Sequence, residues 1–87
     1  MSIKALVEKY IASTEKALQD MKQTKETIEL NEKAINEIVA YAKAYLEDAK
    51  YYKDKKKYET SLTSIAYCEG LIDALKITGA IKIKSSP

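Results

Sequence analysis

The sequence predicts an all-α protein, folded as an up-down-up bundle of three helices with antiparallel neighbours and a short C-terminal tail. Three stretches carry apolar residues at the three- and four-residue spacing of amphipathic helices. The 87 residues include two glycines and one proline, whereas an all-β fold needs turn residues every few positions. Short links between the stretches require sequential helices to run antiparallel. A chain of this length suffices for one domain, which we take as residues 1–87.

The first helix is expected over about residues 3–26, with Ser2 as its N-cap. Its apolar side chains form one stripe, comprising Ile3, Leu6, Val7, Tyr10, Ile11, Ala17, Leu18 and Met21. We expect a break near residues 27–30. An alternative end stays open, because Ile28 would continue the same stripe if the first helix ran on.

The second helix is expected over about residues 31–53, and Asn31 suits its N-cap. Its apolar arc comprises Ala34, Ile35, Ile38, Val39, Ala42, Tyr45, Leu46, Ala49 and Tyr52. The third helix is expected over about residues 57–78, with Gly79 at the C′ position. Because it carries few charged residues, we expect this helix to be covered on more than one side. In the tail, residues 80–87, Ile81 and Ile83 alternate with lysines in a strand-like pattern that is too short to stand alone. The simpler interpretation is a frayed tail that packs one isoleucine on the bundle.

The composition argues against several kinds of chemistry. All fifteen basic residues are lysines, and the chain has no histidine to act as a general base near neutral pH. Three carboxylates could bind a metal ion or act as acid and base, namely Asp48, Glu69 and Asp73. Metal sites in helical bundles, however, usually add histidine ligands. Cys68 lies on the apolar arc of the third helix, where a thiol acts as a small hydrophobe. We therefore expect no enzyme activity, no catalytic residue, no metal and no cofactor.

The expected location is cytoplasmic. A single cysteine rules out an internal disulfide and suits a reducing compartment. The N-terminal region has no apolar signal segment, and no apolar run approaches the length that spans a membrane. We therefore expect no contact with membranes.

A line of small residues, Ala66, Gly70 and Ala74, follows one side of the third helix. A glycine inside a helix costs about 1 kcal/mol relative to alanine, so its position indicates close packing. The favoured interpretation is a contact with the alanine-rich second helix, because sequential helices usually pack together. The alternative is an interaction seam for a second copy or another protein.

The turn before the third helix is rich in lysine. Lys50, Lys53, Lys55, Lys56 and Lys57 surround Asp54, with tyrosines between them. Four of these lysines, Lys53, Lys55, Lys56 and Lys57, form a candidate anion site beside the free N–H groups of the third helix. The simpler interpretation is that lysines at the end of the second helix complement its dipole and keep the turn solvated.

The stretch of residues 42–79 has a recognisable order. It contains Tyr45 with Asp48-Ala49, the pair Tyr51-Tyr52, a polar turn, Ser61-Leu62, Ala66-Tyr67, Gly70, Leu71-Ile72-Asp73-Ala74 and a final Gly79. In this order it resembles the archaeal family catalogued as domain of unknown function 357. The family turn often carries Gly-Asp where this chain has Lys56 and Lys57. The resemblance implies a compact helical bundle of archaeal, cytoplasmic origin and supplies no activity. Related domains joined to nucleotidyltransferase-like domains suggest an accessory role.

The function predicted from the sequence is a non-catalytic protein-interaction or accessory module. Its partner would be another protein or a second copy of the same chain in a homodimer. The alternative is a weak binder of nucleic acid or nucleotide phosphate through the turn Lys50–Lys57. A net charge of +2 is too small to indicate nucleic-acid binding by itself, so this partner is less favoured and stays open.

Overall fold

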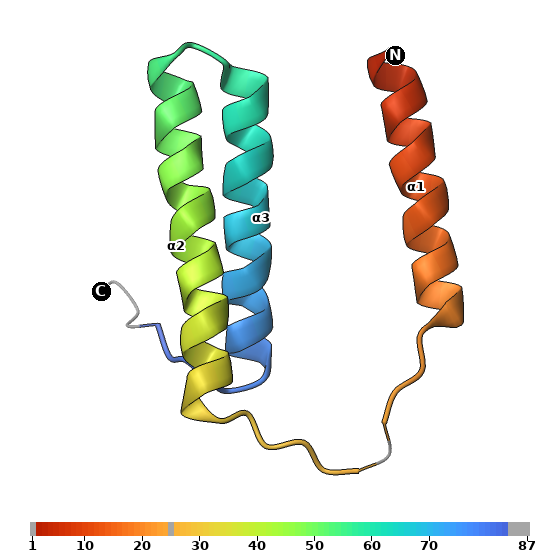
Figure 1. Cartoon of the computed structure of the whole chain (residues 1–87), viewed down its shortest axis with the longest axis vertical. Coiled ribbons are helices and arrows are strands. Elements are labelled where there is room, and N and C mark those ends of the chain that lie inside the picture. The colour runs from red at the N-terminus through yellow and green to blue at the C-terminus, as the bar shows by residue number, and fades with distance from the viewer. Residues whose placement is uncertain (1, 25, 84–87) are drawn as a thin grey trace.

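The computed structural model describes residues 2–24 and 26–83 and shows an all-α fold. The helices are α1 (Ile3–Asp20), α2 (Glu32–Asp54) and α3 (Tyr58–Ile77). Each helix runs antiparallel to the one before it, as predicted (Figure 1). No helix within the described ranges has the length and apolar character needed to cross a membrane.

Three of the helix ends carry the capping residues that the sequence predicts. The Ser2 hydroxyl accepts a hydrogen bond from the Ala5 N–H at 3.0 Å, and the Asn31 side chain accepts one from the Ala34 N–H at 2.8 Å. Both predicted N-caps are therefore confirmed. Gly79 has φ 77° and lies at the C′ position after α3, also as predicted.

The first helix ends at Asp20, short of the expected end near residue 26. Its last turn carries an acidic residue and no basic one, which opposes the helix dipole. None of its residues is buried. Packing against another surface therefore does not stabilise further turns, and the length of the helix depends on helix propensity alone. Residues 21–24 and 26–31 are non-helical, so the break is longer than residues 27–30, and the alternative in which α1 continues through Ile28 is wrong.

Helices α2 and α3 pack against each other as an antiparallel hairpin with a small core. The buried residues are Ala42 and Ala49 from α2, with Cys68 and Leu75 from α3. Alanines at this contact let the two helices approach closely. A hydrogen bond joins the helices, because the Ser61 hydroxyl donates to the Ala49 carbonyl at 2.7 Å.

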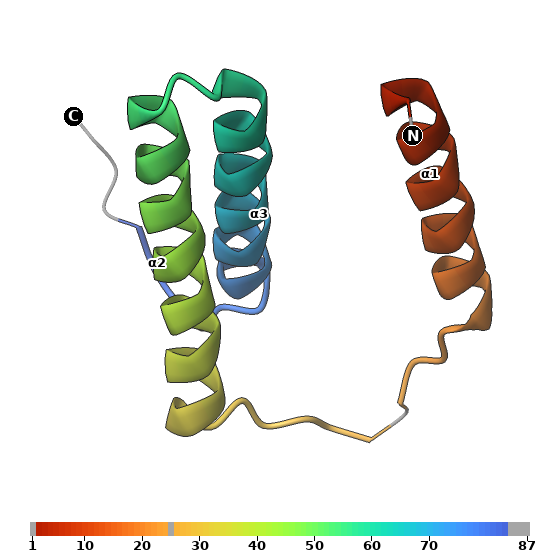
Figure 2. The same ribbon diagram turned by 45° about the horizontal axis from the view of Figure 1, so that its top comes forward.

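Helix α1 stands apart from this hairpin in both views (Figures 1 and 2). It packs against neither α2 nor α3. The radius of gyration is 16.1 Å, whereas a compact chain of this length has about 12 Å. The apolar stripe of α1 is consequently exposed; Ile3 is 72% exposed and Leu18 is 60% exposed.

The tail turns back after Gly79. Ile81 is half-buried and Ile83 is exposed, which confirms that one isoleucine of the tail packs on the helices. The rest of the predicted tail, residues 84–87, lies outside the described residues.

Candidate helix-docking groove

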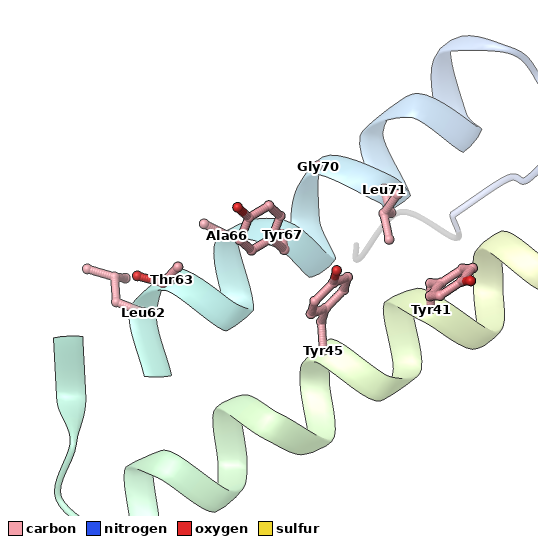
Figure 3. A pocket seen from close by; sticks show the side chains of 8 residues that line it. All are labelled: Tyr41, Tyr45, Leu62, Thr63, Ala66, Tyr67, Gly70 and Leu71. Carbon is pink, nitrogen blue, oxygen red and sulfur yellow. The ribbon is translucent and has the colours of Figure 1, made fainter. Parts of the chain in front are cut away.

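An apolar groove runs along α3 beside α2 (Figure 3). Its lining comprises Tyr41 and Tyr45 from α2, with Leu62, Thr63, Ala66, Tyr67, Gly70 and Leu71 from α3. Three of the large lining residues are open to solvent, since Tyr41, Leu62 and Tyr67 are 58%, 69% and 60% exposed. The groove therefore presents apolar side chains that the chain itself leaves uncovered. We call this feature the α3 groove.

Small residues form the floor of the α3 groove. Ala66 and Gly70 both line it, and Ala74 lies exposed one turn further on. A Cβ atom placed on Gly70 would meet nothing within 4 Å, so the space above this glycine is empty. The floor is therefore a place where another backbone can approach α3 closely.

The favoured sequence interpretation of this line, a contact with α2, is wrong. Cys68 and Leu75 are buried toward α2, whereas Ala66, Gly70 and Ala74 are exposed. At a hundred degrees per residue, the small line lies on the opposite side of α3 from those two core residues. The alternative, an interaction seam for a second copy or another protein, remains a prediction.

A tyrosine pair supports the groove. The rings of Tyr45 and Tyr67 stack with centroids 5.2 Å apart and planes 21° apart. The sequence places Tyr67 within the apolar arc of the third helix, yet this side chain is mostly exposed at the edge of the hairpin. Leu62 was not among the predicted seam residues, although it precedes Ala66 by four positions and so shares its side of the helix.

A second hollow continues the first one toward α1. It is bounded on one side by Thr63 and Tyr67, which also line the α3 groove, and on the other by α1. The α1 residues are Ile3, Leu6, Val7, Tyr10, Ile11, Thr14, Glu15 and Leu18. The stripe of α1 thus faces α3 across an open space, and two apolar surfaces of one chain both lack cover.

The lysine turn has the hydrogen bonds of a Schellman motif. The Lys56 N–H donates to the Lys53 carbonyl at 2.9 Å, and the Lys57 N–H donates to the Tyr52 carbonyl at 2.8 Å. Lys56 occupies the left-handed position of this motif with φ 61°, where glycine is the least strained residue.

The candidate anion site at this turn has a small hollow beside the start of α3. Lys56, Lys57, Tyr58, Glu59 and Thr60 line it, and no side chain caps the helix. Glu59 lies in the first turn, where it already complements the positive end of the helix dipole.

Other lysines near the turn have partners within the chain. The amine of Lys55 lies 5.6 Å from the centre of the Tyr51 ring, and Lys50 pairs with Glu47 at 3.4 Å. These contacts are ordinary surface interactions.

The remaining chemical candidates are not brought together. Within residues 2–24 and 26–83, no three His, Cys, Asp or Glu side chains are placed to hold a metal ion. Asp48, Glu69 and Asp73 are exposed on the helix surfaces. Cys68 is 5% exposed, which confirms its predicted burial as a free thiol in the hairpin core.

Comparison with known proteins identifies the family. The family model described as Protein of unknown function (DUF357) matches residues 9–81, which cover most of α1 and all of α2 and α3. No curated protein and no solved structure matches the chain. The chain therefore belongs to the DUF357 family, in agreement with the resemblance seen in residues 42–79.

Proposed function

We propose that this member of the DUF357 family is a non-catalytic protein-interaction module that binds an amphipathic helix in the α3 groove. The observation that carries the proposal is the uncovered apolar groove with Ala66 and Gly70 as its floor. Helix-in-groove recognition uses an apolar helix face set into such a surface. The absence of histidine from the whole sequence favours binding over catalysis.

The lining has the properties that a docked helix needs. A floor without large side chains lets the helix axes come close, and large apolar residues beside it supply the area to be buried. Leu62, Tyr41 and Tyr67 are those residues, and tyrosine is common among the residues that dominate binding energy at interfaces. The partner helix would bury its own apolar face in the same contact.

Charge around the groove limits the choice of partner. Glu69 and Asp73 follow Ala66 and Gly70 by three positions, so they flank the floor on one side, and both are exposed. A helix with lysine or arginine along the matching edge suits this acidic border better than an acidic helix. The partner class is therefore an amphipathic helix, from another protein or from a second copy, with a basic or balanced edge.

The test compares tagged wild-type protein with Gly70→Leu in extracts of its native cell, with bound proteins and nucleic acids both identified. Lys76→Leu is the matched control, since it adds the same side chain to an exposed position of α3 outside the groove. We expect protein capture or self-association to be lost with Gly70→Leu and kept with Lys76→Leu, while circular dichroism shows unchanged helicity. Equal binding by the two variants, or no protein bound by the wild type at any concentration, contradicts the proposal.

A second candidate function is anion binding at the lysine turn. The observation that favours it is the hollow at the uncapped start of α3, with Lys56 and Lys57 in its lining. Binding of labelled single-stranded RNA and of inorganic phosphate should fall steeply with salt, and Lys56→Gln with Lys57→Gln should reduce it. Lys33→Gln with Lys43→Gln serves as a control of equal charge change. A flat salt response, or no binding at low salt, removes this candidate.

We also propose a cytoplasmic location and an archaeal origin for the protein. A single thiol suits a reducing compartment, and the resemblance in residues 42–79 points to an archaeal family. Fractionation of the native cell, with the protein found in the cytosol or in another fraction, tests the location.

A further inference from the structure

We infer that the α3 groove binds helix α1 of a second copy, so that two copies exchange their first helices in a two-fold symmetric dimer. The inference rests on the proposed function, because it names the helix that the α3 groove accepts. Its carrying observation is different: the chain has two uncovered apolar surfaces, and they face each other across one hollow.

The chain exposes far more surface than a folded monomer of its size. The accessible area is 8088 Å², whereas a monomer of 9.8 kDa is expected to expose about 5,200 Å². A standard protein interface buries about 800 Å² on each partner. The excess of about 2,900 Å² is therefore ample for an extensive dimer contact.

Helix α1 supplies much of this excess. Val7, Ile11 and Leu18 on its stripe are 50%, 52% and 60% exposed, although an amphipathic helix gains most of its stability by burying this face. In proteins, most of the stability of such a helix comes from the packing of its apolar face rather than from helix propensity. Covering the stripe should therefore stabilise α1.

The geometry of the hollow specifies what covers the stripe. Helix α1 lines one side of it and Thr63 and Tyr67 of α3 line the other, so the stripe and the α3 groove are the two apolar surfaces that a partner has to cover. The second copy's α1 covers the α3 groove and has its own stripe covered in the same contact. The two-fold axis then relates two equal contacts, in each of which the stripe of one copy's α1 lies on the α3 groove of the other copy.

The length and charge of α1 suit this exchange. It has 18 residues against 20 in α3, so their lengths match to within about 3 Å. Its three lysines, Lys4, Lys9 and Lys16, balance three acidic residues, Glu8, Glu15 and Asp20. The balanced charge of α1 therefore adds no net repulsion beside the acidic border of the α3 groove.

The connection to α2 permits the exchange. Met21 is extended, with φ −69° and ψ 147°, and residues 26–31 are also non-helical. Such a hinge between two elements is the usual requirement for domain swapping. In the competing arrangement, α1 closes on its own hairpin and uses the same surfaces. The experiment below distinguishes contacts within one copy from contacts between copies.

The experiment measures sedimentation of the full chain over a range of concentrations, together with isotope-filtered NMR on an equal mixture of labelled and unlabelled copies. We expect a dimer, with contacts between Val7 methyl groups of one copy and Tyr67 of the other. Val7→Asp should weaken the dimer at least about a hundredfold, because both copies then place a carboxylate in the apolar contact. Ala12→Asp, on the opposite side of α1, should leave the dimer intact.

Several results would overturn the exchange. A monomer at every concentration does so, as do Val7–Tyr67 contacts confined to one copy. Equal dissociation by Ala12→Asp and Val7→Asp would show that the stripe is not the contact. The exchange can fail while the proposed function stands. This is the result if the protein is a monomer that captures a different protein and loses that capture with Gly70→Leu.

Discussion

The hairpin of α2 and α3 and the lone helix α1 all carry apolar side chains at helical spacing, yet only the hairpin has a core. Leu75 of α3 is 2% exposed, whereas Leu18 of α1 is 60% exposed. Both leucines lie on the apolar side of their helices. The difference is that α3 has small residues opposite it, Ala42 and Ala49 of α2, while α1 has no neighbour in contact. An apolar stripe shows which face needs cover and leaves the covering surface unspecified.

The largest expected effect separates the two regions directly. Leu75→Ala should destabilise the protein by about 2–5 kcal/mol, because it removes the most buried side chain of a four-residue core. Leu18→Ala makes the same chemical change in α1 and should alter stability by less than about 0.5 kcal/mol at concentrations where the chain is a monomer. Urea unfolding followed by circular dichroism measures both. Equal losses would show that α1 is packed as firmly as α3.

The helix caps sharpen the comparison at the level of single hydrogen bonds. Asn31→Ala removes the side chain that caps α2 and should cost about 1 kcal/mol of hairpin stability. Ser2→Ala removes the corresponding bond from α1 and should leave hairpin unfolding unchanged, because α1 contacts neither hairpin helix. Amide hydrogen exchange measures the two regions separately. A loss of protection in α3 caused by Ser2→Ala would show that the regions are coupled.

The two ends of the hairpin provide a third contrast. Lys56 and Gly79 occupy the same position of the same motif, with φ 61° and φ 77°, but only the second is a glycine. Lys56→Gly should therefore stabilise the hairpin by about 1 kcal/mol, which thermal unfolding measures. Lys55→Gly is the control: its φ is −85°, so the change relieves no strain. A gain from Lys55→Gly equal to that from Lys56→Gly would contradict the strain argument.

Local rules made much of the fold predictable from the sequence. Asn31 and Gly79 define helix ends through their own chemistry, so the bounds of α2 and α3 were found to within one residue. The end of α1 was missed because no glycine or strong cap marks it. Residues after Asp20 depend instead on whether another surface packs against them.

The site was only partly predictable, for a reason specific to α3. This helix has apolar or small residues on both sides, with Cys68 and Leu75 on one and Ala66 and Gly70 on the other. The sequence interpretation relied on the close packing that a glycine inside a helix indicates, although Glu69 and Asp73 border that side of α3. In the structure, Cys68 and Leu75 are buried against α2, which leaves the small-residue line as the floor of the α3 groove.

The smallest expected effect concerns two serine hydroxyls. The Ser61 hydroxyl donates across the hairpin to the Ala49 carbonyl at 2.7 Å, while the Ser13 hydroxyl donates within α1 to the Tyr10 carbonyl at 3.2 Å. Ser61→Ala should cost about 0.5–1 kcal/mol, since the bond is partly buried but the Ala49 carbonyl lies inside α2 and keeps its helical partner. Ser13→Ala should change hairpin stability by less than the error of a urea titration. If the two changes cost the same, the Ser61 bond contributes nothing to holding α2 and α3 together, and the burial of Ala42, Ala49, Cys68 and Leu75 alone has to account for the hairpin.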